Sequence, residues 1–351
     1  MREKVFRRLD VHKNYCDSRA VMERTLLDWV QEQFPDTPRK RAKEWILAGR
    51  VSVAGTVVRK PNQMLADAAS VELQGRRLAT LALDEEWRIH ARLSLVYLDP
   101  SLAIVNKGAG LLSVPAPITD FSALSILADF LAGKLRGLGH RTAERRLPSA
   151  FRKLTPLPVH RLDQFTTGVL CLAMNPAARA ALIEQFSAHT ASRRYVAFVD
   201  GRPKTPRGTW RHWLRFDDDA LRQNVSSKPG GEDWVESITH YEVLGECPLG
   251  TTGRVVSKMR FNLETGRTHQ IRAQAAHEGL PLIGDRTYHP LYHASKRERA
   301  FVPIEFERQA LHAEELELAH PVSGQRMKWR VPLPADLQKL EHILHGHQRT
   351  R

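Results

Sequence analysis

Three polar residues stand within four positions at the head of an apolar run. Residues 159–173 read VHRLDQFTTGVLCLA, and the polar residues are His160, Arg161 and Asp163. Along an extended chain, side chains two positions apart project to the same side, so Arg161 and Asp163 share one side and His160 faces the other. A carboxylate beside a guanidinium stays ionised at neutral pH, as a nucleophile or a general base requires. The spacing therefore makes Asp163 a candidate for either kind of chemistry.

A structural role is the alternative for the same aspartate. An Asp at the end of a strand commonly forms a turn or caps a helix. The apolar residues over 159–162 and 169–173 predict two short strands joined by a polar turn over 164–168. On either interpretation Asp163 stands where a buried sheet meets a cleft, and the segment by itself does not choose between them.

A second group of polar residues lies nearer the C-terminus, where residues 263–285 read LETGRTHQIRAQAAHEGLPLIGD. A Thr-Gly turn precedes Arg267 and His269, and Arg272 lies three residues after His269, which is helical spacing. The alternative is a surface helix whose solvent-facing side carries its polar residues, namely Gln270, Arg272 and Gln274.

The sequence does not favour a metal centre. The chain has 16 histidines but no His-Glu-x-x-His segment, and His269 and His277 stand two helical turns apart, too far for easy joint ligation. The three cysteines, Cys16, Cys171 and Cys247, lie far apart without a paired spacing. We therefore expect no metal site and no disulfide framework, and the cysteine pattern suits a reducing cytoplasm.

Two strand-like segments carry further aromatic or polar residues. RRYVAFVDG places Tyr195 in one predicted strand, and QALHAEELELAHPVSG places Leu311, His312 and His320 in or near another. A tyrosine on a half-buried strand commonly belongs to the core, and a single histidine commonly makes a structural hydrogen bond. Neither segment by itself indicates catalysis.

The first part of the chain predicts a small unit of two helices and a hairpin. TLLDWVQEQF places its apolar residues at helical spacing, and RKRAKEWILAG predicts a second helix that ends at Gly49. The strands RVSV and TVVRK flank Ala54 and Gly55, where the glycine supplies the positive φ of a tight turn. The second helix carries a basic cluster that is either a nucleic-acid contact or a solvated face, namely Arg39, Lys40, Arg41 and Lys43.

The remainder of the chain predicts strands more often than helices. Hairpin-like strands begin with LSLVYL and AIVNK, and helices are predicted over 122–135 and 176–189. This order favours an α+β domain with a largely antiparallel sheet over a doubly wound parallel fold. Two polar segments, 136–153 and 221–234, predict exposed loops, and the first of them is basic.

The charge balance indicates a polyanionic partner. Lys and Arg number 53 against 39 Asp and Glu, which gives a net charge of +14. Basic groups set against phosphates release condensed counterions, so this excess favours nucleic acid, although a basic protein without such a partner is the alternative. The N-terminus lacks an apolar signal-peptide core, and no apolar run is long enough to cross a membrane. We expect a soluble cytoplasmic protein with no membrane partner.

The N-terminal unit resembles a known RNA-binding domain. Its basic helix, the segment AGRVSVAGTVVRK and the later strand in ASVEL are similar to the S-four-type domain, first described in a small-subunit ribosomal protein. The resemblance implies that this unit binds RNA. It also implies that the basic residues of the second helix contact the RNA, namely Arg39, Lys40, Arg41 and Lys43.

Five segments together resemble the RluA-type pseudouridine synthase family. In the family's order they are LDPSLAIVNKGAGLLSVP, HRLDQFTTGVLCLA, RRYVAFVDG, LETGRTHQIR with GLPLIGDRTY, and QALHAEELELAHP. One departure is Lys107-Gly108, where the family commonly has Lys-Pro, and this change concerns loop geometry rather than catalysis. The resemblance implies an isomerase that converts uridine to pseudouridine in ribosomal or transfer RNA, by base flipping and without a metal or organic cofactor.

The resemblance also assigns roles to individual residues. Asp163 matches the catalytic aspartate, Tyr195 the tyrosine that packs on the target base, and Arg272 the arginine that pairs with the aspartate. Arg161 matches an arginine that helps to hold the flipped-out nucleotide. The implied contacts to the substrate are Arg161, His160, Arg267, His269 and Leu311.

The implied architecture is a catalytic domain over 93–342, with a mixed, largely antiparallel sheet and a central cleft. Before it we predict an N-terminal extension (1–17), a small α/β RNA-binding domain (18–77) and a linker (78–92), and after it a basic tail (343–351). The resemblance suggests a monomer that acts on ribosomal RNA, with transfer RNA as the alternative. Two other functions stay open: a non-catalytic ribosome-assembly factor with the same fold, and a metal-dependent RNA hydrolase that uses the histidines.

Overall fold

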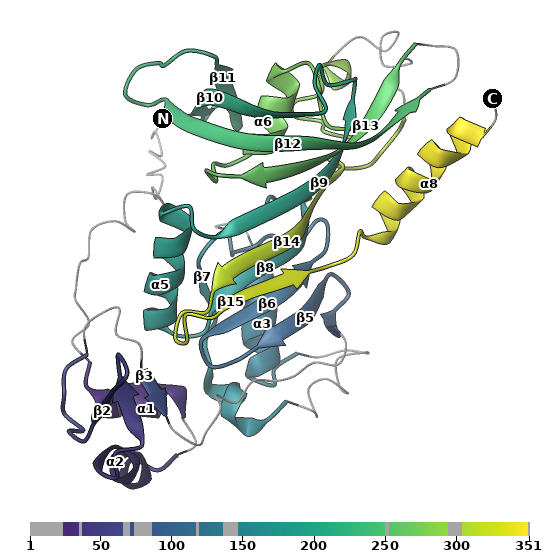
Figure 1. The fold of residues 1–351 in the computed structure, drawn as a ribbon. Helices are drawn as coiled ribbons and strands as arrows, with labels where there is room; N and C mark the ends of the chain where they lie inside the picture. Colours follow the sequence, from purple (N-terminus) through teal and green to yellow (C-terminus); the bar gives the residue numbers. More distant parts are fainter. Residues whose placement is uncertain are drawn as a thin grey trace, which may run out of the picture. The chain divides into compact units, whose positions relative to one another are not determined.

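The computed structural model describes most of the chain, in the stretches 24–34, 37–65, 71–73, 86–116, 119–135, 147–249, 253–293 and 304–349 (Figure 1). The chain divides into two compact units, of which the first reaches to Gly75 apart from 33–36. Of the basic loop expected over 136–153, only 147–153 falls among the described residues. Within the described residues, no helix is long and apolar enough to span a membrane.

The first unit is a pair of helices and a three-stranded antiparallel sheet. The turn between its first two strands consists of Ala54 and Gly55, which both have positive φ (50° and 78°), as a two-residue hairpin requires. The expected helix, helix, hairpin order is confirmed. The elements are α1 (Leu26–Gln33), α2 (Arg39–Leu47), β1 (Val51–Val53), β2 (Thr56–Val58) and β3 (Val71–Leu73), in the strand order β2-β1-β3.

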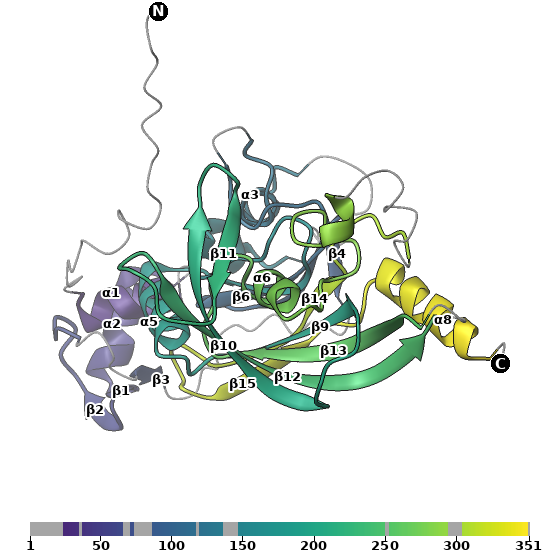
Figure 2. The ribbon, with the colours of Figure 1, turned by 90° about the horizontal axis from the view of Figure 1, so that it is seen from above.

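A large sheet is the framework of the second unit, and its long curved strands β12 and β13 run side by side (Figure 2). The strand order is β11-β10-β12-β13-β9-β14-β8-β6-β5-β4, with β15 beside β14 and β7 beside β8. Because every pair except β8 with β14 is antiparallel, the expected α+β class is confirmed. The strands are β4 (Trp87–His90), β5 (Leu93–Leu98), β6 (Leu102–Lys107), β7 (Leu157–Pro158), β8 (Thr167–Ala173), β9 (Ser192–Asp200), β10 (Arg207–Asp217), β11 (Arg222–Ser226), β12 (Val235–Pro248), β13 (Val255–Leu263), β14 (Leu311–Ala319) and β15 (Arg326–Arg330).

The middle of this sheet is covered on both faces. Every residue of β8 is buried, with Leu170 and Leu172 in one apolar cluster and Val169 and Cys171 in another. Alternation along the strand produces this division, because successive side chains point to opposite faces. The first cluster contains α3 (Ala123–Leu131) and the second α5 (Pro176–Ser187), whereas α6 (Gln270–His277), α8 (Ala335–Arg349) and the short helices η1 (Ser149–Lys153) and η2 (Pro290–Tyr292) complete the unit.

The parallel pairing of β8 with β14 joins segments that are distant in the sequence. Thr167 lies opposite His312 and Gly168 opposite Ala313. Gly168 has a φ of 117°, and a Cβ atom at this position would lie 2.1 Å from the carbonyl oxygen of Ala313. Only glycine fits so close an approach. The junction therefore determines where β8 begins, and with it the position of the HRLD segment.

The prediction of a strand over residues 159–162 is wrong. Only Leu157–Pro158 pairs with β8, and residues 159–163 have no regular secondary structure. Proline has no N–H to donate to a ladder, and the N–H and carbonyl of Leu162 bond instead to the Ser113 hydroxyl, at 2.9 and 2.8 Å. A side chain thus holds this backbone, and Asp163 lies outside the sheet.

Three other segments are more regular than their sequences predict. The expected linker ends in β4, which pairs with β5, and the expected loop over 221–234 contains β11, which pairs with β10. The expected basic tail continues α8 as far as Arg349. None of these polar sequences shows a clear apolar period. Hydrogen bonds to a neighbouring strand order the first two segments, and the third is ordered as the continuation of a helix.

We expect Gly168→Ala to destabilise the second unit by at least about 3 kcal/mol, because the new methyl group overlaps backbone atoms and the φ is unfavourable for alanine. Urea unfolding followed by circular dichroism measures the change. The matched control is Gly245→Ala in β12, where a Cβ meets no atom within 4 Å, and its expected cost is below about 1 kcal/mol. Equal losses in the two variants would show that the β8–β14 junction is not as tight as described.

Candidate active site

Asp163 begins a tight turn directly before β8. The Thr166 N–H donates to the carbonyl oxygen of Asp163 at 3.1 Å, so Gln164 and Phe165 occupy the two central positions of a β-turn. The side chain of Asp163 is 16% exposed. The carboxylate therefore stands at the edge of the sheet, on a turn whose geometry decides where it points.

Two buried cations hold the central peptides of this turn. Lys107 Nζ donates to the carbonyl of Gln164 at 3.0 Å and to two carbonyls of the loop that follows Lys107, at 3.2 and 2.8 Å. The Arg308 guanidinium donates to the carbonyl of Phe165 at 3.1 Å. Both side chains are almost completely buried. Because hydrogen bonds from two buried side chains fix both carbonyls, the turn is rigid although it lacks regular structure.

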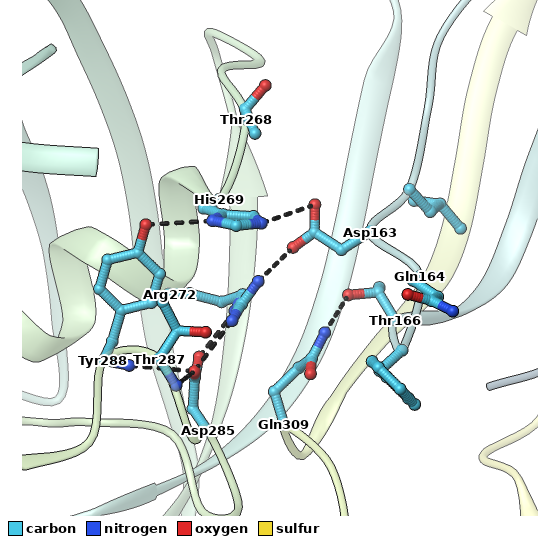
Figure 3. Close-up of polar contacts among 12 residues, drawn as sticks. Asp163, Gln164, Thr166, Thr268, His269, Arg272, Asp285, Thr287, Tyr288 and Gln309 are labelled. Carbon is cyan, nitrogen blue, oxygen red and sulfur yellow. Dashed lines mark hydrogen bonds and ion pairs between the residues drawn. The ribbon is translucent and has the colours of Figure 1, made fainter. Parts of the chain in front are cut away.

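The carboxylate of Asp163 faces the guanidinium of Arg272 (Figure 3). Nη1 of Arg272 lies 3.1 Å from Oδ2 of Asp163, while its Nε and Nη2 bind both oxygens of Asp285 at 2.7 and 2.9 Å. Arg272 lies on α6 and Asp285 in the loop after it. Burial disfavours the charge of Arg272, but the hydrogen bonds to Asp285 and the charges of both carboxylates raise its pKa above the ordinary value.

The two carboxylates around Arg272 are not equivalent. Asp285 is completely buried and also accepts hydrogen bonds from the N–H groups of Thr287 and Tyr288, at 3.0 and 3.2 Å. Asp163 has one hydrogen bond to the guanidinium and is partly exposed. Asp285 is thus suited to orient Arg272, and Asp163 is the carboxylate that a substrate can reach.

His269 lies on the other side of the Asp163 carboxylate, with Nε2 3.9 Å from Oδ1. Its Nδ1 is 3.1 Å from the Tyr288 hydroxyl, which accepts a hydrogen bond from the Gln223 N–H at 2.6 Å. That arrangement lets Tyr288 donate to Nδ1, which leaves the imidazole proton on Nε2, toward Asp163. Burial lowers the pKa of His269, although the Asp163 charge opposes this shift. A neutral imidazole is therefore favoured at neutral pH.

Asp163, Arg272 and His269 line a cavity of about 330 Å³, at the small end of the usual range for ligand pockets. Its wall also contains Arg286, Thr287 and Glu307. The first two belong to GLPLIGDRTY, a segment of the family resemblance whose place along the chain does not indicate that it faces Asp163, and no pattern in the sequence points to Glu307. Among the described residues, no group of three or more His, Cys, Asp or Glu side chains is arranged to hold a metal ion.

Comparison with known proteins decides the family. Residues 101–277 match the model for RNA pseudouridylate synthase, and residues 24–68 match the S4 domain. Over 326 residues the chain is 35% identical to ribosomal large subunit pseudouridine synthase D of Salmonella typhimurium, across 89% of this chain and 87% of that protein. The chain belongs to the RNA pseudouridylate synthase family. The expected family and N-terminal domain are confirmed.

Other members of the synthase family agree with this result. The protein of the same name from Pseudomonas aeruginosa is 34% identical over 328 residues, which are 91% of each chain. The solved structure of human RNA pseudouridylate synthase domain containing 1 gives a TM-score of 0.51 at 23% identity, over 73% of this chain and 95% of that one. At this identity the structural match supports the synthase fold alone.

The synthase fold brings part of the predicted site together. Asp163, Arg272 and His269 meet at the cavity. Tyr195 is buried on β9, opposite Phe261 and Ala313 of the neighbouring strands, and is not among the described residues that line the cavity. Burial raises the pKa of the Tyr195 phenol, and the negative charge of Asp163 acts in the same direction.

The other predicted substrate contacts lie away from the cavity wall. His160 is turned from Asp163, packs its ring on Phe186 at 4.6 Å and accepts a hydrogen bond from the backbone of β8 at 2.9 Å. The side chain of Leu311 is buried in the apolar core. Arg161 and Arg267 are exposed, but neither belongs to the described residues that line the cavity. Alternation along the chain had predicted the opposite orientations of His160 and Asp163.

The alternative of a solvent-facing helix is wrong for α6. Gln270, Arg272 and Gln274 are all buried. The amide of Gln274 donates to the carbonyl of Ser237 at 3.0 Å and accepts from the Thr239 hydroxyl at 2.6 Å. The polar side of α6 therefore packs on polar groups of β12. Polarity alone could not distinguish this buried network from a hydrated surface.

The basic residues of the S4 domain are exposed on α2, whose buried side consists of Ala42, Trp45 and Ile46. Arg39 forms an exposed ion pair with Asp28 at 3.2 Å, a kind of contact that contributes little to stability. The exposed basic residues are Arg39, Lys40, Arg41 and Lys43. They form a cationic surface on this unit that fits the expected contact with RNA.

We expect Lys107→Met to change how stability depends on pH. Burial lowers the pKa of Lys107 from 10.5 to about 7, with a further decrease caused by Arg308 and an opposing effect of Asp163. Between these values the unfolded chain binds a proton that the folded chain releases, so the free energy of unfolding rises with pH. From about pH 7 to about pH 9, the wild type should gain about 2 kcal/mol relative to the variant.

Urea unfolding at each pH measures this difference. The matched control is Lys339→Met on α8, because Lys339 is exposed, and its difference from the wild type should not change with pH. If the Lys107→Met difference is also constant, the three carbonyl oxygens keep the ammonium group charged and the expected loss of its proton does not occur.

Proposed function

We propose that this chain converts specific uridines of large-subunit ribosomal RNA to pseudouridine, with Asp163 as the catalytic residue. The observation that carries the proposal is the Asp163 carboxylate, which is bound to a buried guanidinium at 3.1 Å and stands in the wall of a nucleoside-sized cavity. The relatives from Salmonella typhimurium and Pseudomonas aeruginosa, named as ribosomal large subunit pseudouridine synthases, support the choice of RNA.

The reaction needs few groups because all heavy atoms of the base are retained. The bond between the ribose C1′ and the uracil N1 breaks, the base turns and a bond forms between C1′ and C5, while the C5 hydrogen leaves as a proton and N1 takes up a proton. Asp163 serves in one of two ways: it attacks the sugar or the ring, or it removes a sugar proton to give a glycal. Both routes require one accessible carboxylate oxygen, and the Oδ1 atom of Asp163 is not bound to Arg272.

Arg272 acts as the positioning residue for Asp163. Its hydrogen bonds to Asp285 fix the plane of the guanidinium before any substrate arrives. A preorganised cation of this kind orients the carboxylate without rearrangement during the reaction. His269, with its proton on Nε2, is a neutral donor beside the same carboxylate. The donor is suited to an oxygen of the uracil or ribose rather than to a metal.

The target uridine must leave the RNA stack to reach this cavity. Flipping costs a few kcal/mol and is least costly where a base is already unpaired, so a loop or bulge is the expected target. Contacts of basic side chains with phosphates offset this cost. We propose that Tyr195 contacts the uracil ring and that Arg161 contacts the displaced nucleotide, because these residues match the family's base-packing tyrosine and its arginine for the flipped-out nucleotide. We further propose, from the likeness to ribosomal large subunit pseudouridine synthases, that the protein acts in the cytoplasm as a monomer.

A non-catalytic RNA-binding factor is the alternative function. Such a factor must bind RNA, but RNA binding does not require a partly exposed carboxylate that is paired with a buried arginine. Such an arrangement is costly to maintain, because removing a charged group such as the arginine from water carries a penalty of several kcal/mol. The arrangement therefore favours an enzyme over a binding protein.

We expect Asp163→Asn to reduce turnover at least about 1000-fold, because the amide can neither attack nor accept a proton. Release of tritium from RNA labelled at C5 of uridine measures the reaction, since this hydrogen is lost when C5 bonds to C1′. Binding of the same RNA should be unchanged within about threefold. The control is Asp129→Asn, an exposed carboxylate on α3, which should retain full activity. Turnover by Asp163→Asn would remove this residue from the chemistry.

We expect a strain without this gene to lack pseudouridine at defined positions of large-subunit ribosomal RNA and to keep the pseudouridines of transfer RNA. Chemical mapping of all stable RNAs, with and without the gene, measures this difference. The wild-type gene should restore the sites and Asp163→Asn should not. Loss confined to transfer RNA would refute the proposed substrate while leaving the reaction intact.

A further inference from the structure

Phe165 is a large apolar side chain that the fold leaves exposed beside the catalytic carboxylate. Its exposed fraction is 46%, and it belongs to the residues that line the cavity. Asp163, two positions earlier, has 16% of its side chain exposed. A single exposed apolar side chain is common on protein surfaces, but this one lines the cavity beside the carboxylate of Asp163, where a ligand can contact it.

The backbone of Phe165 cannot relax toward the core. Residue 165 is at the third position of the turn that Asp163 begins, and its carbonyl accepts a hydrogen bond from Arg308 at 3.1 Å. The preceding carbonyl, of Gln164, accepts from Lys107 at 3.0 Å. Two buried side chains thus fix the backbone that carries the ring, close to the carboxylate. The ring is displayed by a rigid support, as expected of a binding residue rather than of a mobile loop tip.

A cation lies beside the ring. A Cβ atom at Gly110 would lie 3.8 Å from the Phe165 ring and 3.0 Å from the Arg92 guanidinium, so the ring and the guanidinium flank this glycine. Arg92 is exposed, and its guanidinium is 3.5 Å from the carbonyl oxygen of Gly110. An aromatic ring and a guanidinium this close together can contact the base and the phosphate of one nucleotide.

We propose that Phe165 stacks on the nucleobase next to the target uridine, while Arg92 contacts the phosphate of that nucleotide. The inference rests on the proposed function, because it assumes RNA at this site. The target base enters the cavity, where Asp163, Arg272 and His269 face it, and the ring at the rim meets a base that stays outside. Stacking on an aromatic ring tolerates any base, so this contact supplies affinity and position rather than sequence recognition.

Substitution of Phe165 tests the proposal in turnover. Phe165→Leu keeps an apolar side chain but removes the ring, and Phe165→Trp keeps a stacking surface. With unmodified large-subunit ribosomal RNA, the leucine variant should raise KM about 10-fold, within a range of about 5- to 100-fold, with kcat changed less than about threefold. The tryptophan variant should stay within about threefold of the wild type. A loss that tryptophan does not rescue overturns the stacking role.

The matched control is Phe121→Leu. Phe121 has the same exposed fraction of 46%, packs edge-on against His90 at 5.3 Å and is not among the described residues that line the cavity. It should leave KM unchanged within about twofold. An equal increase in KM for Phe121→Leu and Phe165→Leu overturns the proposal, because the effect would then belong to exposed apolar area in general.

A crosslinking experiment separates this proposal from the proposed function. An oligouridylate of about ten nucleotides that contains 4-thiouridine is irradiated with the full-length protein, and the modified peptide is identified by mass spectrometry. An adduct at Phe165 in the wild type, absent from Phe165→Leu and present in Phe165→Trp, supports stacking even if ribosomal RNA is not turned over. Adducts confined to other peptides overturn the proposal even if the wild type is active. Equal urea midpoints for the variants establish that they are folded.

Discussion

The guanidinium of Arg272 holds two carboxylates from different segments of the chain, and the geometry of the site follows from this interaction. Asp285 uses both oxygens and two backbone N–H groups, which makes it a fixed anchor. Asp163 has one hydrogen bond to the arginine and partial access to solvent. The same residue type thus has two roles, and the number of hydrogen bonds to each carboxylate decides which one is available for chemistry.

The turn that carries Asp163 needs a second set of charges. Its central carbonyls are bound by Lys107 and Arg308, which come from β6 and from the segment before β14. A buried lysine with carbonyl partners costs desolvation, and this cost appears in its lowered pKa. The hydrogen bonds from this lysine hold the loop rigid, although the loop does not belong to the sheet. Arg308, which lines the cavity, also places positive charge there, which favours the entry of a phosphate-bearing substrate.

The sheet makes these contacts possible through its one parallel pair. The β8–β14 junction places the turn that follows the HRLD segment beside the segment that carries Arg308, although the two are far apart in the sequence. Gly168 permits this approach because its lack of a Cβ leaves room for the carbonyl of Ala313. A strand buried on both faces keeps this junction fixed. Preorganisation of the site is therefore a property of the middle of the sheet as much as of the residues in the cavity.

The sequence by itself determined the features that depend on neighbouring residues. The period of the apolar residues predicted α1, α2 and the hairpin, alternation separated His160 from Asp163, and ordered motifs predicted the family. The tertiary structure alone decided which polar groups are buried together. It turned Gln274 and Arg272 inward, recruited Lys107 and Arg308 to the turn, and placed Tyr288 beside His269. The physical reason is that periodicity reports on contacts within a few residues, whereas a buried polar group is satisfied by partners that only the folded chain brings within hydrogen-bonding distance.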